Sequence, residues 1–369
     1  MIFEDLLKQY CSKGVDMIPL EELIHESTER NKKLLFSDIR SVSSQYGLIS
    51  TDEFFENSPA SNNTSAYKVV RPGMFAYNPA RINIGSITFS TLQHPVLVSP
   101  MYNIFSINDS RITHEYLLLW LRSNKGMHEI STRVEVGARF RLPLSTLNKI
   151  RIPLPPIVVQ KQITEKLQTI KNLINELEDD IELRKKQYVY YRNQLLDIEY
   201  EEGVEMKSLG EIACKITSGK NKSKSPEGPY PVFGSTGIIA YTETYLYDSP
   251  LILVARVGAN AGYVHMSYGK YDVTDNTLIV DLKKTVEQKY VYYVLIKEEI
   301  NKFAKGGGQP LITSSILKHV MIPVPSLKKQ QSIVKKLDAF TSLISKLQEE
   351  RDLRQKQYEY YREKLLTFE

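Results

Sequence analysis

Cysteine and histidine are too few and too scattered in this 369-residue chain to build a metal site or a disulfide framework. The two cysteines, Cys11 and Cys214, form no CxxC pair and no zinc-ligand spacing. The six histidines are also isolated from one another; they are His25, His94, His114, His128, His265 and His319. The sequence therefore predicts a protein with no structural metal and no disulfide, and no cofactor is expected.

Long apolar runs are missing as well. No uninterrupted stretch approaches the roughly 18 residues that a membrane-spanning helix needs. The chain begins MIFEDLLKQY, which is acidic and amphipathic and does not fit a secretory signal. We therefore expect a cytoplasmic protein that makes no membrane contact.

Signatures of nucleotide chemistry are absent. There is no G-x-x-x-x-G-K-[ST] phosphate loop, because Gly219-Lys220 is followed by asparagine, and there is no glycine fingerprint of a dinucleotide site. Asn78-Pro79 begins like the Asn-Pro-Pro-aromatic motif of amino-methyltransferases. However, Ala80-Arg81 follows and no cofactor loop accompanies it, so a methyltransferase site is not favoured.

A nuclease site is the other catalytic alternative. Asp281-Leu282-Lys283 could imitate the end of such a site, with Asp272 or Asp275 as the acidic partner. A surface strand end is the preferred interpretation. With no catalytic motif established, the chain is interpreted as a recognition protein.

What the sequence does contain is a long internal repeat. Residues 150–199 align without a gap to residues 320–369, and about two-fifths of the paired positions are identical. A repeat of this length indicates a duplicated structural unit. A chain built as A–B–A–B can close with approximate two-fold symmetry, which is also the symmetry of duplex DNA.

Each copy predicts one long amphipathic helix. A proline-rich opening that ends at Pro156 or Pro325 prevents an earlier helix start. No glycine or proline follows until Gly203 in the first copy, and none follows in the second. Apolar residues then recur in alternating steps of four and three, which is a heptad seam. A helix of about 37 residues would be roughly 55 Å long.

Two such helices can cover each other's seams as a coiled coil. The first seam is formed by Ile163, Leu167, Ile170, Ile174, Leu177, Ile181, Tyr188, Tyr191 and Leu195, with Arg184 in one gap. The second is formed by Ile333, Leu337, Phe340, Ile344, Leu347, Tyr358, Tyr361 and Leu365, with Arg351 and Arg354 inside it. If a two-fold axis relates the repeats, the helices run antiparallel with the intervening segments at opposite ends. The alternative is two unrelated helices packed on separate globular parts.

The segments before the helices look like diverged copies. Residues 17–23 are echoed by residues 206–212, and residues 83–87 by residues 260–264. Short β-branched and aromatic runs between turn residues predict a small α/β segment with a twisted, mainly antiparallel sheet.

Two such runs are residues 249–254 and 276–280. One helix is expected at residues 114–122, and a second of the same type at residues 286–302.

Several loops in each segment combine glycine, small polar residues and a base. Lysine and arginine suit phosphate, and arginine or asparagine can pair with base edges. The net charge of +5 is only mildly basic, so such binding would come from local patches. One such loop alone is more often a solvated turn; the argument is that several occur in each copy. The candidate DNA-binding residues are Tyr77, Asn78, Arg81, Arg139, Arg141, Lys220, Lys222, Lys224, Ser235, Thr236, Arg256 and Gln309.

The combination resembles the specificity subunit of type I DNA restriction-modification systems. The resemblance rests on the Ile152-Pro153-Leu154-Pro155-Pro156 opening, the long heptad helix, the YYRxxLL ending and the divergent segment before each copy. Residues 209–219 and 230–238 resemble the target-recognition domains of that family.

The resemblance implies an α+β fold, in which two globular α/β target-recognition domains are separated by two long antiparallel helices that form an intramolecular, pseudo-two-fold-symmetric coiled coil. The domains would be residues 1–150 and 203–320, and the spacer helices residues 151–202 and 321–369. Such a subunit is non-catalytic. It reads a bipartite asymmetric double-stranded DNA target, docks two methyltransferase subunits and is joined by restriction subunits. Base-reading residues in the family follow no fixed motif, so the residues named above rest on their chemistry.

Two other functions stay open at this point. The chain could be a coiled-coil scaffold whose terminal domains bind protein, or an autonomous nuclease.

Overall fold

The two stretches that lack proline and glycine form the two longest helices of the structure. The computed structural model describes residues 9–50, 63–133, 140–306 and 310–368. Within it, α6 (Ile157–Leu196) and α10 (Leu327–Thr367) begin just after the proline-rich openings, as predicted. Among the residues described, no helix has both the length and the apolar character needed to cross a membrane.

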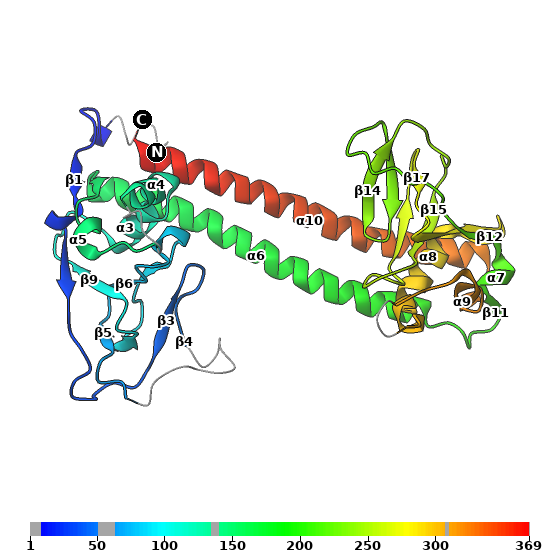
Figure 1. Ribbon diagram of the computed structural model, residues 1–369, viewed down its shortest axis with the longest axis horizontal. Helices are drawn as coiled ribbons and strands as arrows, with labels where there is room; N and C mark the ends of the chain where they lie inside the picture. The colour runs from blue at the N-terminus through cyan, green and yellow to red at the C-terminus, as the bar shows by residue number, and fades with distance from the viewer. Residues whose placement is uncertain (1–8, 51–62, 134–139, 307–309, 369) are drawn as a thin grey trace. The chain divides into compact units, whose positions relative to one another are not determined.

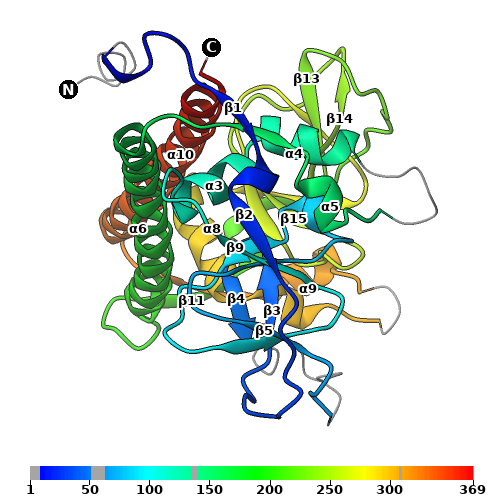
Figure 2. The ribbon, with the colours of Figure 1, turned by 90° about the vertical axis from the view of Figure 1, so that its left-hand side faces the viewer.

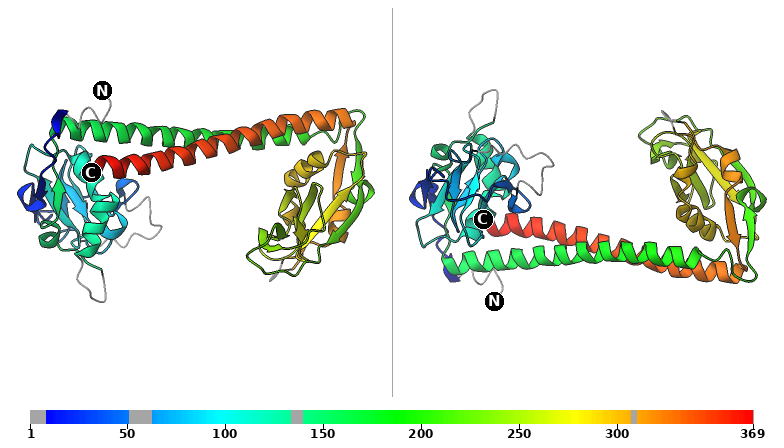
Figure 3. Two further views of the ribbon diagram at one scale, coloured as in Figure 1. Left: turned by 90° about the horizontal axis from the view of Figure 1, so that it is seen from above. Right: turned by 90° about the horizontal axis from the view of Figure 1, so that it is seen from below.

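The chain divides into two compact units, each with one globular part and stretches of both long helices. Unit 1 comprises Met1–Glu176 and Glu350–Glu369, and unit 2 comprises Leu177–Glu349. In unit 1, Val159 near the start of α6 shares a buried cluster with Leu366 near the end of α10. The stretch of α6 therefore leads away from the globular part and the stretch of α10 returns to it, side by side and antiparallel (Figures 1 and 3).

The same antiparallel pairing occurs in unit 2. Leu196 at the end of α6 lies in one buried cluster with Ile333 near the start of α10. The ring of Tyr191 stacks on that of Phe340, with centroids 5.3 Å apart. The predicted coiled-coil seam is thus confirmed inside each unit.

The globular part of unit 1 is built on a four-stranded sheet, with small ribbons beside it (Figure 2). Across the sheet the strands are β2 (Ile24–Ser27), β9 (Asn103–Ile107), β6 (Phe75–Tyr77) and β7 (Ile87–Phe89). The ribbons are β1 (Met17–Pro19) with β10 (Arg151–Pro153), β3 (Arg40–Ser43) with β4 (Gly47–Ser50), and β5 (Lys68–Val70) with β8 (Val96–Val98). The helices are η1 (Leu20–Glu22), η2 (Ile82–Ile84), α3 (His114–Leu121), α4 (Asn124–Thr132) and α5 (Leu144–Leu147).

Unit 2 repeats this plan. Its four-stranded sheet contains β12 (Ala213–Ser218), β18 (Thr277–Leu282), β15 (Leu251–Ala255) and β16 (Val264–Ser267). β11 (Glu205–Ser208) pairs with β19 (Met321–Val324), and a second sheet contains β14 (Gly237–Thr242), β13 (Tyr230–Gly234) and β17 (Asp272–Val273). The helices are α7 (Leu209–Ile212), α8 (Gln288–Lys297), η3 (Ile300–Phe303) and α9 (Ser314–Lys318).

The matching order of the two four-stranded sheets confirms that the globular segments are diverged copies. In chain order, the first strand of each sheet pairs with the fourth, the fourth pairs with the second, and the second pairs with the third. All named strand pairs are antiparallel except β13 with β17, so the expected mainly antiparallel sheet is also confirmed.

The single helix expected at residues 286–302 is wrong in its extent. The chain leaves α8 at Glu298, and Glu299 adopts a left-handed φ of 48° before η3 begins. The turn lets Ile300 enter the core of unit 2. It also brings the Asn301 backbone against Gly262, where an added Cβ would lie 2.3 Å from the Asn301 nitrogen.

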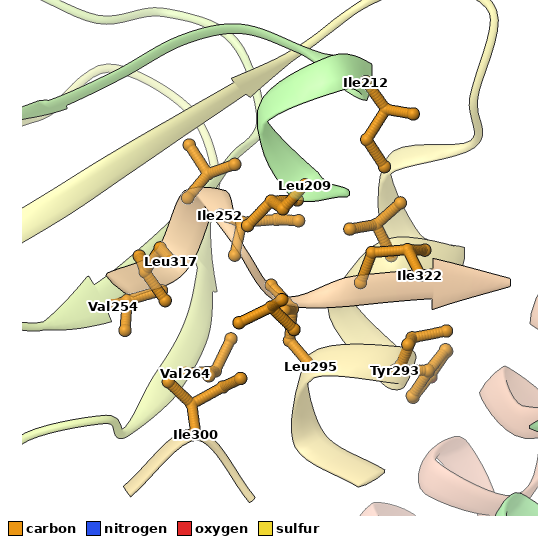
Figure 4. Close-up of a cluster of buried hydrophobic side chains, with 14 of the residues drawn as sticks. Leu209, Ile212, Ile252, Val254, Val264, Tyr293, Leu295, Ile300, Leu317 and Ile322 are labelled. Atoms are coloured by element: carbon orange, nitrogen blue, oxygen red, sulfur yellow. The ribbon is translucent and has the colours of Figure 1, made fainter. Parts of the chain in front are cut away.

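The globular part and the long helices share one core in each unit. In unit 2 the buried side chains of Leu209, Ile252, Leu295 and Ile322 pack together (Figure 4). Leu337 of α10 belongs to the same cluster. Because each such side chain contributes about 1.5–3 kcal/mol when it leaves water, the globular part is anchored to the helices mainly by apolar burial.

A buried glutamine adds a directional link between each globular part and its long helix. In unit 1, the Gln160 side-chain oxygen accepts a hydrogen bond from the Thr113 backbone N–H at 2.9 Å, and its nitrogen donates to the Pro155 carbonyl at 2.8 Å. In unit 2, Gln330 bonds in the same way with the Glu287 N–H and the Pro325 carbonyl, both at 2.8 Å. We call this arrangement the glutamine clamp.

The clamp acts on equivalent points of the two units. Thr113 and Glu287 are the N-cap residues of α3 and α8. Those helices also carry buried tyrosines, Tyr116 and Tyr290, which donate to the carbonyls of Pro153 and Pro323 at 2.8 and 2.7 Å. Helices α3 and α8 are thereby tied to the proline-rich openings of α6 and α10.

Candidate nucleic-acid interface

Three of the loops predicted to bind DNA meet in unit 2 at residues 273–277, the turn between β17 and β18. The Lys220 N–H donates to the Val273 carbonyl at 2.9 Å. The Thr274 N–H donates to the Phe233 carbonyl at 2.9 Å, which brings the β13–β14 hairpin to the same place. Loops separated by many residues in the sequence therefore form one surface.

Arg256 completes this cluster. Its backbone N–H donates to the Asn276 carbonyl at 2.9 Å, and its guanidinium Nη1 lies 3.4 Å from the Asp275 carbonyl oxygen. Its Nε is buried and has no hydrogen-bond partner among the residues that the structure describes. The guanidinium is half-buried and held at the turn, and a planar guanidinium is the group suited to bidentate recognition of a base edge.

Three lysines lie on the loop that contains Lys220 and Asn221. Lys220, Lys222 and Lys224 are exposed. The shape of their loop is fixed by Asn221, whose amide donates to an Asp272 carboxylate oxygen at 2.8 Å. Ammonium groups displayed on a fixed loop suit contacts with phosphate oxygens.

In unit 1, Arg81 and Arg141 are brought together by a main-chain link. The Leu142 N–H donates to the Pro79 carbonyl at 3.0 Å, and both arginines are exposed. Unit 2 has the equivalent link, from the Ile312 N–H to the Arg256 carbonyl at 2.8 Å. The two units therefore build the same loop junction around different basic residues.

Tyr77 does not lie on the surface as predicted. It is fully buried in β6; its hydroxyl donates to the Leu142 carbonyl at 3.0 Å and accepts from the Asn103 amide at 2.9 Å. Burial raises the pKa of Tyr77 well above its usual value. We therefore replace the predicted DNA contact of Tyr77 with a role in holding the Leu142 segment. Asn78 is also nearly buried, and its side-chain oxygen accepts from the Ala80 N–H at 3.0 Å and shapes the loop.

The remaining predicted residues divide into two groups. Ser235 is partly exposed and Thr236 exposed at the tip of the β13–β14 hairpin, where they join the cluster of unit 2. Arg139 and Gln309 lie outside the described residues.

The structure adds residues that the sequence did not single out as DNA contacts. Asp275 and Asn276 are exposed at the centre of the unit 2 cluster. Tyr263 is also exposed, and its ring stacks on that of His265, with centroids 5.7 Å apart. In the sequence, Asn276 only marks the start of a predicted strand. Its position beside Arg256 depends on long-range strand pairing.

The possible nuclease residues are engaged separately. The Lys283 ammonium donates to the Glu211 carbonyl at 2.6 Å, while Asp272 accepts from Asn221. Within the described ranges, no group of three or more His, Cys, Asp or Glu side chains could hold a metal ion.

Comparison with known proteins agrees with this architecture. Residues 13–184 and 201–354 match the family described as type I restriction modification DNA specificity domain. The chain is 30% identical over 310 residues to the type I restriction enzyme EcoR124I/EcoR124II specificity subunit of Escherichia coli, covering 73% of this chain and 74% of that protein. It is 29% identical over 244 residues to the EcoprrI specificity subunit of Escherichia coli, covering 62% of this chain and 60% of that protein.

A solved structure shows the same fold. The S subunit of a type I restriction-modification system from M. genitalium aligns with a TM-score of 0.60 and 13% identity, over 95% of this chain and 96% of that one. At this identity the likeness concerns the fold alone.

Proposed function

Because the chain belongs to the family of type I restriction-modification DNA specificity domains, we propose that it reads a bipartite asymmetric DNA target for a type I complex. Residues 1–150 and 203–320 are the two target-recognition domains in this proposal, and residues 151–202 and 321–369 are the spacer helices. The observation that carries it is the duplication of one loop junction, with Arg81 and Arg141 in one unit and Arg256 in the other.

Each domain contacts one half of the target in this mechanism. Exposed lysines such as Lys222 neutralise phosphates, which gives affinity without sequence preference. Arginines held at the junctions present a planar fork to guanine O6 and N7, which gives sequence preference. Two different domains in one chain would read two different half-sequences, so the complete target is asymmetric.

The catalytic work belongs to partner subunits in this proposal. Two methyltransferase subunits dock on the helices, and restriction subunits join the complex. The relatives named as specificity subunits of type I restriction enzymes support this division. The chain itself contributes recognition only.

The test is the methylation pattern of cells that express the chain together with its methyltransferase subunit. A two-part motif with a fixed gap is expected, and it should disappear when the chain is omitted. Methylation at a continuous motif, or at no motif, would contradict the proposal. Pull-down with and without nuclease treatment separates a protein scaffold from a DNA reader, and plasmid incubated with the purified chain and Mg²⁺ should stay uncut.

A further inference from the structure

The β13–β14 hairpin of unit 2 exposes two consecutive isoleucines beside its tip. Ile238 is 52% exposed and Ile239 is 50% exposed. Consecutive strand residues normally point to opposite faces, so one of the two would usually be covered. Here the register shifts between Val232 and Phe233, which pair with Ala240 and Ile238 and leave Ile239 as the extra residue of a bulge. Bulges commonly re-aim side chains at functional sites.

The position of Ile239 depends on a glycine in the opposite strand. A Cβ added to Gly234 would lie 2.7 Å from the Ile239 Cδ1 atom, far closer than two carbon atoms approach. Ile239 therefore lies across the space that a side chain at position 234 would fill. Two apolar side chains are in this way held next to the Ser235-Thr236 tip, although neither is part of a core cluster.

Basic residues lie at both ends of this hairpin. The Ser223 hydroxyl donates to the Tyr241 carbonyl at 2.7 Å, so the loop that carries Lys222 and Lys224 runs beside β14. The hairpin meets the turn that holds Arg256 close to its tip, through the Phe233 carbonyl.

Carboxylates lie near the hairpin as well. Asp272 is bonded to Asn221 and Asp275 is exposed at the turn, while Glu227 and Glu243 are exposed near the Tyr241 end of the hairpin. The groups that favour an anionic partner are Lys220 and Arg256, because both are held at the turn that meets the hairpin near its tip.

Duplex DNA is the anionic partner that fits this shape. The major groove admits a two-stranded β-ribbon, and the thymine C5-methyl is the apolar group displayed on its base edges. We propose that the β13–β14 hairpin enters the major groove, with Ile238 and Ile239 against thymine methyl groups and Ser235 and Thr236 at the groove floor. This proposal rests on the DNA-reading function proposed above and names one of its reading elements.

Uracil substitution tests the proposal, because uracil differs from thymine only by the missing methyl. Binding of the complete chain with its methyltransferase subunits is measured on duplexes in which each thymine of the target is replaced singly. Losing one buried methyl costs about 0.8 kcal/mol, so affinity should fall about fourfold at one or more positions of one half-site. The Ile238→Ala and Ile239→Ala variants should bind more weakly but lose this uracil penalty. Ile238→Val should largely keep it.

The outcomes distinguish failure of the proposed DNA-reading function from failure of the hairpin proposal alone. If the wild-type complex prefers no two-part target, the proposed function fails. If it prefers one but uracil costs nothing, or the half-sites contain no A·T pair, only the hairpin proposal fails. An unchanged uracil penalty in both alanine variants also overturns it.

Two further measurements guard against misinterpretation. Leu35→Ala, at an aliphatic side chain of unit 1 that is 71% exposed, is the matched surface control and should leave both affinity and uracil penalty unchanged. Thermal unfolding of each variant shows that it folds. Weaker capture of the methyltransferase subunit by Ile238→Ala, with unchanged uracil discrimination, would mark the hairpin as a protein contact and overturn the proposal.

Discussion

The Gln160 side chain accepts a hydrogen bond from the Thr113 backbone N–H at 2.9 Å and is itself completely buried. The same side chain donates to two carbonyls, those of Pro155 and Arg111. One residue of α6 thus satisfies three main-chain groups that burial would otherwise leave without partners. The cost of losing it follows from those three groups.

Replacing Gln160 with alanine should destabilise unit 1. An unpaired N–H or carbonyl group costs about 1–3 kcal/mol where water cannot reach it, and three groups lose their partner, so we expect a total loss of at least about 3 kcal/mol. The only tryptophan of the chain, Trp120, is buried in unit 1, and its fluorescence during urea unfolding reports that unit. The exposed neighbour variant Gln162→Ala should shift the transition by less than about 0.5 kcal/mol. Gln330→Ala should leave the tryptophan transition in place; a shift as large as that of Gln160→Ala would contradict separate clamps.

Lys222→Ala should weaken binding to every duplex alike. Each phosphate contact contributes about 0.9 to the slope of log affinity against log salt, so removing one should flatten the slope by about that amount. Binding to target and random duplex at several salt concentrations measures it. The exposed Lys284→Ala variant removes the same charge away from the cluster and should change neither slope. A loss restricted to the target sequence would assign Lys222 to base reading instead.

Arg256 should affect one position of the target. Arg256→Ala is expected to cost about 1–3 kcal/mol on the target and to relax discrimination at one base pair of one half-site. Arg256→Lys keeps the charge but loses the planar fork, so it should restore affinity more than discrimination. A panel of singly substituted duplexes measures both effects. Equal weakening on all duplexes would contradict a base-reading role.

Length changes in the helices should change the gap between half-sites. Inserting four residues after Glu176 of α6 and after Glu349 of α10 lengthens both helices by about 6 Å. With base pairs about 3.4 Å apart, we expect a gap longer by about one or two base pairs, or loss of binding. The methylation motif of cells that express the variant shows which occurs. Four substitutions at the same places without insertion serve as the control, and an unchanged motif in the insertion variant would refute a spacer role.

Acid should destabilise the chain partly through His265. Burial lowers the pKa of its imidazole, and among the described residues neither ring nitrogen has a hydrogen-bond partner. The unfolded chain then takes up this proton at a higher pH than the folded chain. Stability is therefore lost as pH falls from the ordinary histidine pKa of about 6.5 toward the lowered folded value. His265→Phe should lose less stability between pH 7.5 and pH 5.5 in urea unfolding followed by circular dichroism, and an equal loss would contradict this assignment.

Local patterns were sufficient to predict the helices but not the interface. The proline-rich openings and the heptad seam are encoded in neighbouring residues, so α6 and α10 begin where expected. The junction of Lys220, Phe233 and Arg256 at one turn depends on strand pairing across many residues, which no local pattern encodes. Tyr77 was misassigned because its neighbours resemble a binding loop, whereas all of β6 is buried. The identity of Gln160 and Gln330 within the repeat was a visible signal of the clamp, but their burial was not.

The glutamine clamp forms hydrogen bonds with main-chain atoms alone, since its partners are backbone N–H groups and carbonyls. Every residue except proline offers an N–H, and every residue offers a carbonyl. The residues that contact a ligand can therefore change through many substitutions during evolution, while the hydrogen bonds that hold each globular part to its long helix are kept. A lineage could acquire new sequence preferences by rewriting loops, with no compensating change in the helices that carry them.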